Sequence, residues 1–366
     1  MPKYLITLLA FALFACNSSS SDDEIFQIID SDSSGLDFIN VIDETDKVNY
    51  FKYMYMYIGG GLAVADFDND GLEDVFMVSN SNESKLYKNL GDLKFQDVTG
   101  ISGISKRPGF DVGAAVADIN NDGWLDIYIT RGGWIDENDA FANMLFINNG
   151  IQKDADGNSF VTFTEQAKAY GLDEANRGVA ATFFDYDRDG DLDLYLSNTP
   201  DFEDKSAYVI DLEKVATDPR TLALKGSDKL YNNNGKGFFN DVSLSAGIKA
   251  DIGFGLSPQV GDLNGDYWPD IYVCNDFRVP DFVYINQQDG TFKESRNETI
   301  KHMSFNSMGA DIGDINNDGD LDIMTLDMNP EDHVRAKTTM GMTSQYLFEL
   351  MVNKNYHHQY MHNMLQ

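Results

Sequence analysis

Nine consecutive residues near the end of the sequence read Asp314-Ile315-Asn316-Asn317-Asp318-Gly319-Asp320-Leu321-Asp322. They follow the pattern D-x-[DN]-x-D-x-x-x-D, in which acidic or amide side chains stand at positions 1, 3, 5 and 9. Four earlier segments follow the same pattern and begin at Asp66, Asp118, Asp185 and Asp262. Five copies in one chain indicate an internal repeat, so we expect an array of similar structural units.

The residue types in this pattern suit a calcium ion. Ca²⁺ takes about six to eight oxygen ligands, and a tightly wound loop lets side chains at alternate positions converge on one ion. Carboxylates held so close together would repel one another without a cation, which disfavours the alternative of metal-free turns rich in Asp, Asn and Gly. We therefore predict a Ca²⁺ site in each of the five loops. The predicted ligands are Asp66, Asp68, Asp70, Asp74, Asp118, Asn120, Asp122, Asp126, Asp185, Asp187, Asp189, Asp193, Asp262, Asn264, Asp266, Asp270, Asp314, Asn316, Asp318 and Asp322.

One loop departs from the pattern of the others. Glycine permits the sharp turn at position 6 of a calcium loop, and it is present as Gly71, Gly123, Gly190 and Gly319. The loop that starts at Asp262 has Tyr267 at this position. We expect this loop to be distorted or to bind calcium more weakly than the other four.

The residues around the loops are typical of strands. An EF-hand needs a bidentate Glu at position 12 and a helix on each side, whereas position 12 is apolar or Thr in all five loops. Short apolar, β-branched and aromatic runs lie before and after the loops, as in 61–65 and 75–78. Such runs predict buried strands, so we expect each loop to join the two strands of an antiparallel hairpin.

A second recurring element follows most of these hairpins. In the segment Leu230–Ser243, an aromatic strand, an Asn/Gly turn and a strand anchored by Phe form another hairpin. Two hairpins give four strands in about 50 residues, which is the size of a β-propeller blade. The sequence therefore predicts an all-β fold, a β-propeller of four-stranded blades with calcium-binding hairpin loops.

The two elements together resemble a known repeat. The loop with its flanks, followed by L-[YF]-x-N-x-G and F-x-D-V-[TS], resembles the FG-GAP/VCBS repeat of integrin-α-like β-propellers. It is most similar to that of bacterial VCBS-repeat lipoproteins related to cartilage acidic protein, which often carry a C-terminal ASPIC/UnbV domain. The resemblance extends from Ser34 to the end and implies Ca²⁺ bound through loop positions 1, 3, 5 and 9. It does not name a ligand.

The sequence divides into four parts. Residues 1–15 are predicted to be a lipoprotein signal peptide, because the apolar run Tyr4–Ala15 is too short to span a bilayer. The quartet Leu13-Phe14-Ala15-Cys16 resembles a bacterial lipobox, which implies lipid attachment at Cys16; a cleaved secretory signal or a hydrophobic helix is the alternative. The other parts are an acidic, Ser-rich tether (16–33), the propeller repeats (34–329), and a helical insertion with the start of a further, truncated repeat (330–366).

The last residues indicate an unfinished repeat. The segment His362–Gln366 is similar to the beginning of Asn143–Gly150, which belongs to a second hairpin. We therefore expect a fragment of a longer protein, with an incomplete ring or one of the seven-bladed type. The alternative is that Asn49–Tyr57 completes the last blade as a strand, since its tyrosines alternate as strand residues do.

Composition and motifs exclude several classes of function. The formal net charge is -33, which opposes binding to nucleic acid or to anionic lipid, because both need Lys and Arg. Two cysteines cannot form a disulfide framework, and Cys274 is expected to be a buried strand residue. No nucleotide-binding or nucleophile motif is present, so we predict no nucleotide ligand and no catalytic residue.

The expected function is binding rather than catalysis. We expect an extracytoplasmic, calcium-binding lipoprotein at the outer membrane or cell surface, touching the membrane only through its lipid; without the lipid it would be secreted. Its partner would be a protein or a glycan. The insertions 135–142 and 202–227 would bind it, because loops on a rigid scaffold carry specificity; the alternative is that these insertions have no role in binding. The alternatives are a carbohydrate-active enzyme or its accessory subunit with structural calcium, and a purely structural segment of a surface protein. Two metal-free carboxylates in a deep funnel would favour the enzyme.

Overall fold

The computed structural model describes residues 26–46, 49–104, 107, 109–132, 141–153, 157, 159–200, 209–218, 221, 226–276, 279–339 and 344–366. The predicted signal peptide, Cys16 and tether residues 16–25 lie outside the described residues, as do 135–140 and 202–208 of the two predicted insertions. Among the described helices, none has the length and apolar character needed to cross a membrane.

Four antiparallel sheets of four strands follow one another along the chain. The first two consist of β1 (Leu62–Ala65), β2 (Asp74–Met77), β3 (Lys85–Asn89) and β4 (Phe95–Asp97), then β5 (Asp111–Ala117), β6 (Asp126–Arg131), β7 (Met144–Lys153) and β8 (Ser159–Glu165). The next two consist of β9 (Gly178–Phe184), β10 (Asp193–Asn198), β11 (Lys229–Asn233) and β12 (Phe239–Asp241), then β13 (Gly255–Gly261), β14 (Asp270–Asn275), β15 (Phe282–Asn286) and β16 (Phe292–Glu294). Strands lie side by side in sequence order in each sheet, which confirms the prediction of four-stranded antiparallel units.

The fifth sheet has three described strands. They are β18 (Ser307–Gly313), β19 (Asp322–Asp327) and β21 (Met364–Leu365). The helices α7 (His333–Thr339) and α8 (Gln345–Asn353) come between its second and third strands, and β20 (Gln359–Tyr360) pairs in parallel with β17 (Met303–Ser304). Residues near Met364, predicted to start a further repeat, pair here with β19 inside the fifth sheet.

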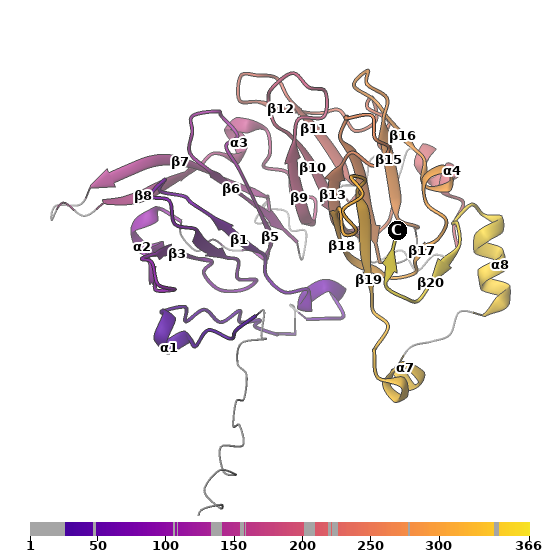
Figure 1. The fold of residues 1–366 in the computed structure, drawn as a ribbon, viewed down its shortest axis with the longest axis horizontal. Helices are drawn as coiled ribbons and strands as arrows, with labels where there is room; N and C mark the ends of the chain where they lie inside the picture. The colour runs from indigo at the N-terminus through magenta and orange to yellow at the C-terminus, as the bar shows by residue number, and fades with distance from the viewer. Residues whose placement is uncertain are drawn as a thin grey trace, which may run out of the picture.

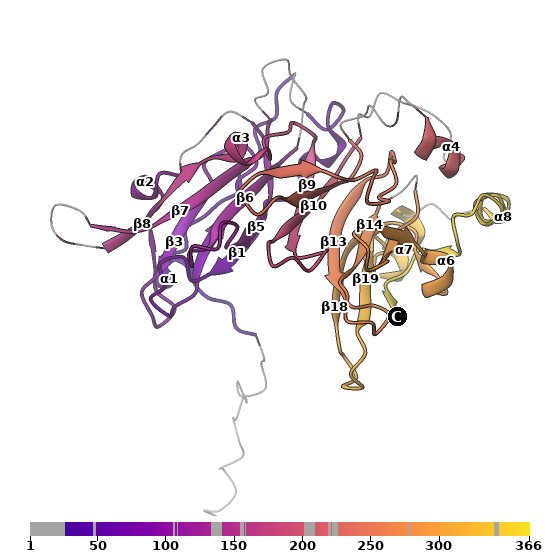
Figure 2. The ribbon, with the colours of Figure 1, turned by 90° about the horizontal axis from the view of Figure 1, so that it is seen from above.

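The sheets stand next to one another in an arc (Figure 1). Neighbouring sheets contact through their first strands: β1 meets β5, β5 meets β9, β9 meets β13, and β13 meets β18. The first strands therefore line the inside of the arc, and the described part of the chain forms a propeller-like array rather than a closed ring. Figure 2 shows the same arrangement from above.

Apolar side chains fill the spaces between sheets. All six residues of β6, of β10 and of β14 are buried, as expected for short apolar runs covered on both faces. One core cluster joins Phe67 and Phe76 of the first sheet to Ile127 and Phe163 of the second, and similar clusters join the later sheets. Stacked sheets bury faces that no single sheet could bury alone. Cys274 is buried within β14, as predicted.

Short helical turns lead from one sheet to the next. They are α2 (Thr99–Ser102), α3 (Ala167–Tyr170) and α6 (Arg296–Thr299), while α1 (Ser31–Ser34) precedes the first sheet and α4 (Leu212–Thr217) lies within a predicted insertion. In a related turn, Gly247 has φ 83°, and a Cβ there would lie 2.4 Å from the carbonyl oxygen of Phe292. Only glycine fits this close approach to the outer strand of the following sheet.

The tyrosine segment near the N-terminus is not a strand. Residues Met54–Tyr57 form the 3₁₀ helix η2, so the prediction that Asn49–Tyr57 completes a blade as a strand is wrong. Tyr53, Tyr55 and Met56 are buried against Phe110 and Phe254 in a core cluster on the inner side of the sheets. Burial of these residues on the inner strands overrides the alternating pattern, which is short and carries little information on its own.

Candidate metal centres

The five aspartate loops connect the first and second strands of the five sheets and share one backbone geometry. The position 1 carboxylate accepts the N–H of position 5 at 3.0–3.1 Å and that of position 6 at 2.7–3.1 Å. The position 9 carboxylate accepts the N–H of position 2 at 3.0–3.2 Å. The first and last acidic residues of each loop thus hold the turn in place. Each loop is flanked by two strands, as predicted, and not by the helices of an EF-hand.

The loop with Tyr267 keeps the geometry of the other four. In the first loop, Asn69 has φ 55° and Gly71 has φ 89°, so positions 4 and 6 are both left-handed. In the loop that starts at Asp262, Gly265 takes position 4 with φ 77° and Tyr267 takes position 6 with φ 68°. The expected distortion is therefore absent from the backbone of this loop. A left-handed tyrosine costs about 1–2 kcal/mol, and its 80% exposed side chain packs little in return.

The position 9 carboxylate also binds the third strand of its sheet. Its Oδ1 accepts a backbone N–H from an Asn at 2.7–2.8 Å in the first four loops. The pairs are Asn89 with Asp74, Asn148 with Asp126, Asn233 with Asp193, and Asn286 with Asp270. Sequence reasoning missed this role, although the Asn of the L-[YF]-x-N pattern was the signal for it. Position 9 therefore joins the loop to the second hairpin.

The same carboxyls are buried. Desolvation raises the pKa of Asp74 to about 6, of Asp126 to about 7, of Asp193 to about 8 and of Asp270 to about 6. Backbone N–H donors oppose this rise, while neighbouring loop carboxylates add to it. Negative charge is thus costly in these loops in the absence of a cation.

Two loops bring three carboxylates together. In each, one carboxylate oxygen from positions 1, 3 and 9 lies within 4.8 Å of the other two. These residues are Asp66, Asp68 and Asp74 in the first loop, and Asp185, Asp187 and Asp193 in the third. Asp68 Oδ1 and Asp187 Oδ1 are buried and have no hydrogen-bond partner. Such oxygens need a partner, and a hard divalent cation such as Ca²⁺ favours carboxylate oxygen, so the residues present fit the ion.

The other three loops have Asn at position 3. Its Oδ1 accepts the N–H of position 5 at 2.9–3.0 Å. The residues are Asn120, Asn264 and Asn316. Three carboxylates do not converge in the described residues of these loops, so calcium there stays a prediction from the repeat pattern.

A lysine reaches into the first loop. Lys88 of β3 contacts the carboxylates of Asp68 and Asp70, and its Nζ lies 2.7 Å from Asp70 Oδ2. Burial lowers the pKa of Lys88, but the two carboxylates outweigh burial and raise it. In the third loop the corresponding residue is Asn232, whose Nδ2 donates to Asp187 Oδ2 at 3.0 Å. The carboxylates of the first loop therefore already have a positive charge beside them, the ammonium group of Lys88.

Neighbouring loops are also connected to each other. Asn69 donates to the carbonyl oxygen of Gly123 at 3.0 Å, which joins the first loop to the second. The guanidinium of Arg188 in the third loop lies 4.7 Å from the ring centroid of Trp268 in the fourth. A change in the conformation of one loop will therefore alter the contacts of the neighbouring loop.

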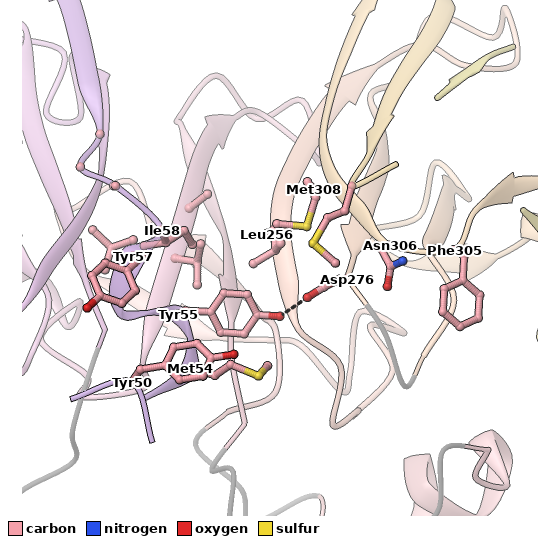
Figure 3. A pocket seen from close by; sticks show the side chains of 18 residues that line it. Tyr50, Met54, Tyr55, Tyr57, Ile58, Leu256, Asp276, Phe305, Asn306 and Met308 are labelled. Carbon is pink, nitrogen blue, oxygen red and sulfur yellow. Dashed lines mark hydrogen bonds between the residues drawn. The ribbon is translucent and has the colours of Figure 1, made fainter. Parts of the chain in front are cut away.

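A central cavity of about 770 Å³ lies at the opposite ends of the same strands. Its wall includes Gly61 ahead of β1, Gly113 in β5, Val179 in β9, Leu256 in β13 and Met308 in β18. These residues stand at or near the starts of the first strands, whereas the aspartate loops follow their ends. In Figure 3 the N-terminal tyrosine segment faces residues of the fourth and fifth sheets across this cavity.

A protein-family model described as an FG-GAP-like repeat matches residues 66–129 and 262–325. Each match begins at the first Asp of an aspartate loop and extends into the second strand of the following sheet. The chain contains FG-GAP-like repeats. This confirms the resemblance derived from the loops and the L-[YF]-x-N-x-G element.

The chain is also similar in sequence to cartilage acidic protein 1 of several animals. The chain is 24% identical over 273 residues to cartilage acidic protein 1 of Xenopus tropicalis, covering 72% of this chain and 39% of that protein. It is 22% identical over 275 residues to cartilage acidic protein 1 of Homo sapiens, covering 72% and 38%. This FG-GAP-repeat chain thus spans well under half the length of the relatives it matches.

Solved structures show only a distant likeness. A GH32 beta-fructofuranosidase of Bombyx mori has a TM-score of 0.38 and 12% identity, covering 73% of this chain and 55% of that one. The V. cholerae biofilm matrix protein Bap1 has a TM-score of 0.32 and 14% identity, covering 73% and 34%. The propeller-like arrangement is seen in the order and contacts of the sheets of this chain.

Proposed function

We propose that this chain is a calcium-stabilised binding module that works outside the cell. The observation that carries the proposal is the convergence of three carboxylates within 4.8 Å in two of the aspartate loops. Each of these loops has one buried carboxylate oxygen without a partner. The FG-GAP-like repeats and the relatives named cartilage acidic protein 1 support it.

The chain's residues would hold the ion and make it structural. In the first loop Asp66, Asp68 and Asp74 would be ligands, and in the third Asp185, Asp187 and Asp193. A bound Ca²⁺ would supply positive charge to carboxylates that otherwise repel one another. Because Asp74 and Asp193 also bind the third strand, the ion would fix both hairpins of a sheet.

A binding role agrees better with the central cavity than an enzymatic one. Retaining and inverting glycosidases place two carboxyl groups on either side of the scissile bond. Asp276 is the single carboxyl group among the described residues that line the cavity. The tyrosines Tyr50, Tyr55 and Tyr57 line it as well, and aromatic surfaces favour binding. We therefore propose a non-enzymatic module for a protein or glycan partner, anchored through Cys16 at the bacterial surface or secreted.

The first experiment measures bound calcium and thermal stability. Elemental analysis of the purified, dialysed protein should find at least two Ca²⁺ per chain, one for each loop with three convergent carboxylates. Melting in calcium should exceed melting in EDTA by several degrees, since an ion that binds only the folded state stabilises it. No bound calcium together with equal melting temperatures would refute the proposal.

A paired variant separates calcium binding from general damage. Asp187→Ala removes the position 3 ligand from the third loop, and Asn232 can still donate to Asp193 Oδ1, which lies 3.2 Å from its Nδ2. The control Asp289→Ala removes an exposed carboxyl on the β15–β16 turn. We expect the loss of about one calcium ion in Asp187→Ala only.

A further inference from the structure

The central cavity contains a buried carboxyl group that is only half satisfied. Asp276 lines the cavity and is 4% exposed. Its Oδ2 accepts the hydroxyl of Tyr55 at 2.6 Å, the bond drawn in Figure 3. Its Oδ1 has no hydrogen-bond partner. A buried carboxylate with an unpartnered oxygen is unfavourable, so this atom calls for a donor.

The described wall supplies no positive charge to this carboxyl. No Lys, Arg or His is among the described residues that line the cavity. Burial raises the pKa of Asp276, and the Tyr55 hydroxyl only partly offsets the rise. A cationic ligand would both donate a hydrogen bond to the free oxygen of Asp276 and neutralise the negative charge of its carboxylate.

The rest of the wall is apolar and aromatic. Val112, Val179 and Leu256 come from three different sheets, and Met54, Met308 and Met328 add three thioethers. Tyr50 and Tyr57 are stacked at the edge, with ring centroids 6.5 Å apart and an interplanar angle of 26°. Such a wall accommodates an apolar stem, and tyrosine faces and methionine sulfur tolerate a nearby cation.

We propose that the central cavity binds an ammonium group carried on an apolar stem, with the ammonium at Asp276 and the stem along the methionines and tyrosines. The inference deepens the proposed binding function and rests on it. The formal net charge of -33 raises the local concentration of cations around the protein. A free alkylamine and a lysine side chain of a partner share this chemistry.

The test is a titration of the full chain in calcium buffer, after its calcium-dependent melting has been established. The probes are hexylamine, hexanol and hexanoate, which share a stem and differ in the head group. Calorimetry should give binding of hexylamine, binding of hexanol at least about tenfold weaker, and none for hexanoate, since losing one buried ion pair costs at least about tenfold in affinity. Equal affinities for the amine and the alcohol would overturn the proposal.

Two variants locate the site. Asp276→Asn should weaken hexylamine at least about tenfold, and the exposed-carboxyl control Asp289→Asn should leave its affinity unchanged. Met308→Lys places a competing ammonium in the wall and should abolish hexylamine binding even where Asp276→Asn fails to fold. Unchanged affinity in a folded variant of either kind would refute the assignment. Loss of calcium-dependent melting in the unmodified chain would count against the proposed function, not against the cavity.

A further arm distinguishes the two sources of the ammonium group. The peptide acetyl-Leu-Lys-Leu-amide is compared with its norleucine counterpart, which has the same stem without the charge. Binding of hexylamine and of the lysine peptide, but not of the norleucine peptide, would assign a protein partner. Binding of hexylamine alone would assign a free amine, and binding of neither would overturn the proposal.

Discussion

At the scale of single residues, charge and its partner decide what each loop does. Lys88 contacts Asp68 and Asp70 in the first loop, whereas the third loop has the neutral Asn232 at the corresponding place. The ammonium group is a competitor for any metal ion, because both are attracted by the same oxygens. Two loops with equivalent carboxylates should therefore differ in calcium affinity.

Replacing Lys88 tests this difference. Lys88→Met removes the competing charge and keeps the length of the side chain, so we expect tighter binding of calcium at the first loop, by about tenfold, and a lower melting temperature in EDTA. Calcium titration calorimetry and melting curves measure the two effects. Lys85→Met is the control, because Lys85 pairs with Asp37 and Asp97 outside the loop. Equal calcium isotherms for Lys88→Met and the unmodified chain would contradict the expectation.

A buried carboxyl away from the loops gives a pH prediction. Asp228 is 3% exposed, and burial together with the neighbouring Asp251 raises its pKa well above the usual value. The folded state then holds a proton that the unfolded state has released, so stability falls as pH rises above the ordinary carboxyl range of about 4. Burial also raises the pKa of Asp251 to about 6, which adds to the fall between 3.8 and about 6.

The variant Asp228→Asn should remove much of this dependence. Its Oδ1 still accepts the N–H of Asn198, which is 2.8 Å away in the present structure. We expect the free energy of unfolding at mildly alkaline pH to rise by about 1 kcal/mol or more. Urea unfolding at several pH values measures it, with Asp289→Asn as the exposed control. A steeper fall of stability with pH in Asp228→Asn would contradict the assignment.

At the scale of elements, each sheet is closed by the same few contacts. The side chain of the residue immediately before the third strand accepts a backbone N–H from the end of the second strand or just beyond it, at 2.8–3.1 Å in all five sheets. The acceptors are Ser84, Asn143, Asp228, Asp281 and Asn363. In the first four sheets the position 9 carboxylate binds the third strand at its other end, so the two hairpins of each of these sheets are joined at both ends.

One connection between sheets depends on a glycine, Gly247, whose backbone lies too close to its neighbour for a Cβ atom. Gly247 and Gly290 have nearly equal positive φ values, 83° and 81°, but a Cβ on Gly247 would lie 2.4 Å from Phe292 O and one on Gly290 would meet nothing within 4 Å. We expect Gly290→Ala to cost about 1–2 kcal/mol for the left-handed backbone alone. Gly247→Ala should cost clearly more, on the order of 3–5 kcal/mol. Chemical denaturation of both variants measures the difference, and equal costs would show that the close approach can relax.

At the scale of the whole molecule, packing between sheets stabilises the array, and repulsion between its negative charges destabilises it. Four core clusters each join two neighbouring sheets, and contacts between the aspartate loops connect neighbouring sheets on one side of the array. The net charge of -33 adds repulsion across the array.

Salt should therefore stabilise the calcium-free chain. We expect the melting temperature in EDTA to rise with KCl concentration, because screening shortens the range of repulsion to about 10 Å or less. With calcium bound, the same salt should have a smaller effect, since the loop charges are already neutralised. Melting curves at matched ionic strengths test this, with sucrose as an uncharged control. A salt effect equal in size with and without calcium would contradict it.

Local patterns in the sequence determine the units of this protein, and long-range packing determines how they work together. Loop positions, strand-forming runs and the four-stranded sheets all follow from spacings within about 50 residues, and the structure has them. The hydrogen bond between Tyr55 and Asp276, 221 residues later, follows from no such spacing. The turn at Met54–Tyr57 likewise depends on burial against distant strands, which overrides a short alternating pattern. The periodicity of apolar residues in the sequence indicates which face of an element is buried. Which side chains from different sheets face each other is determined only by the tertiary structure.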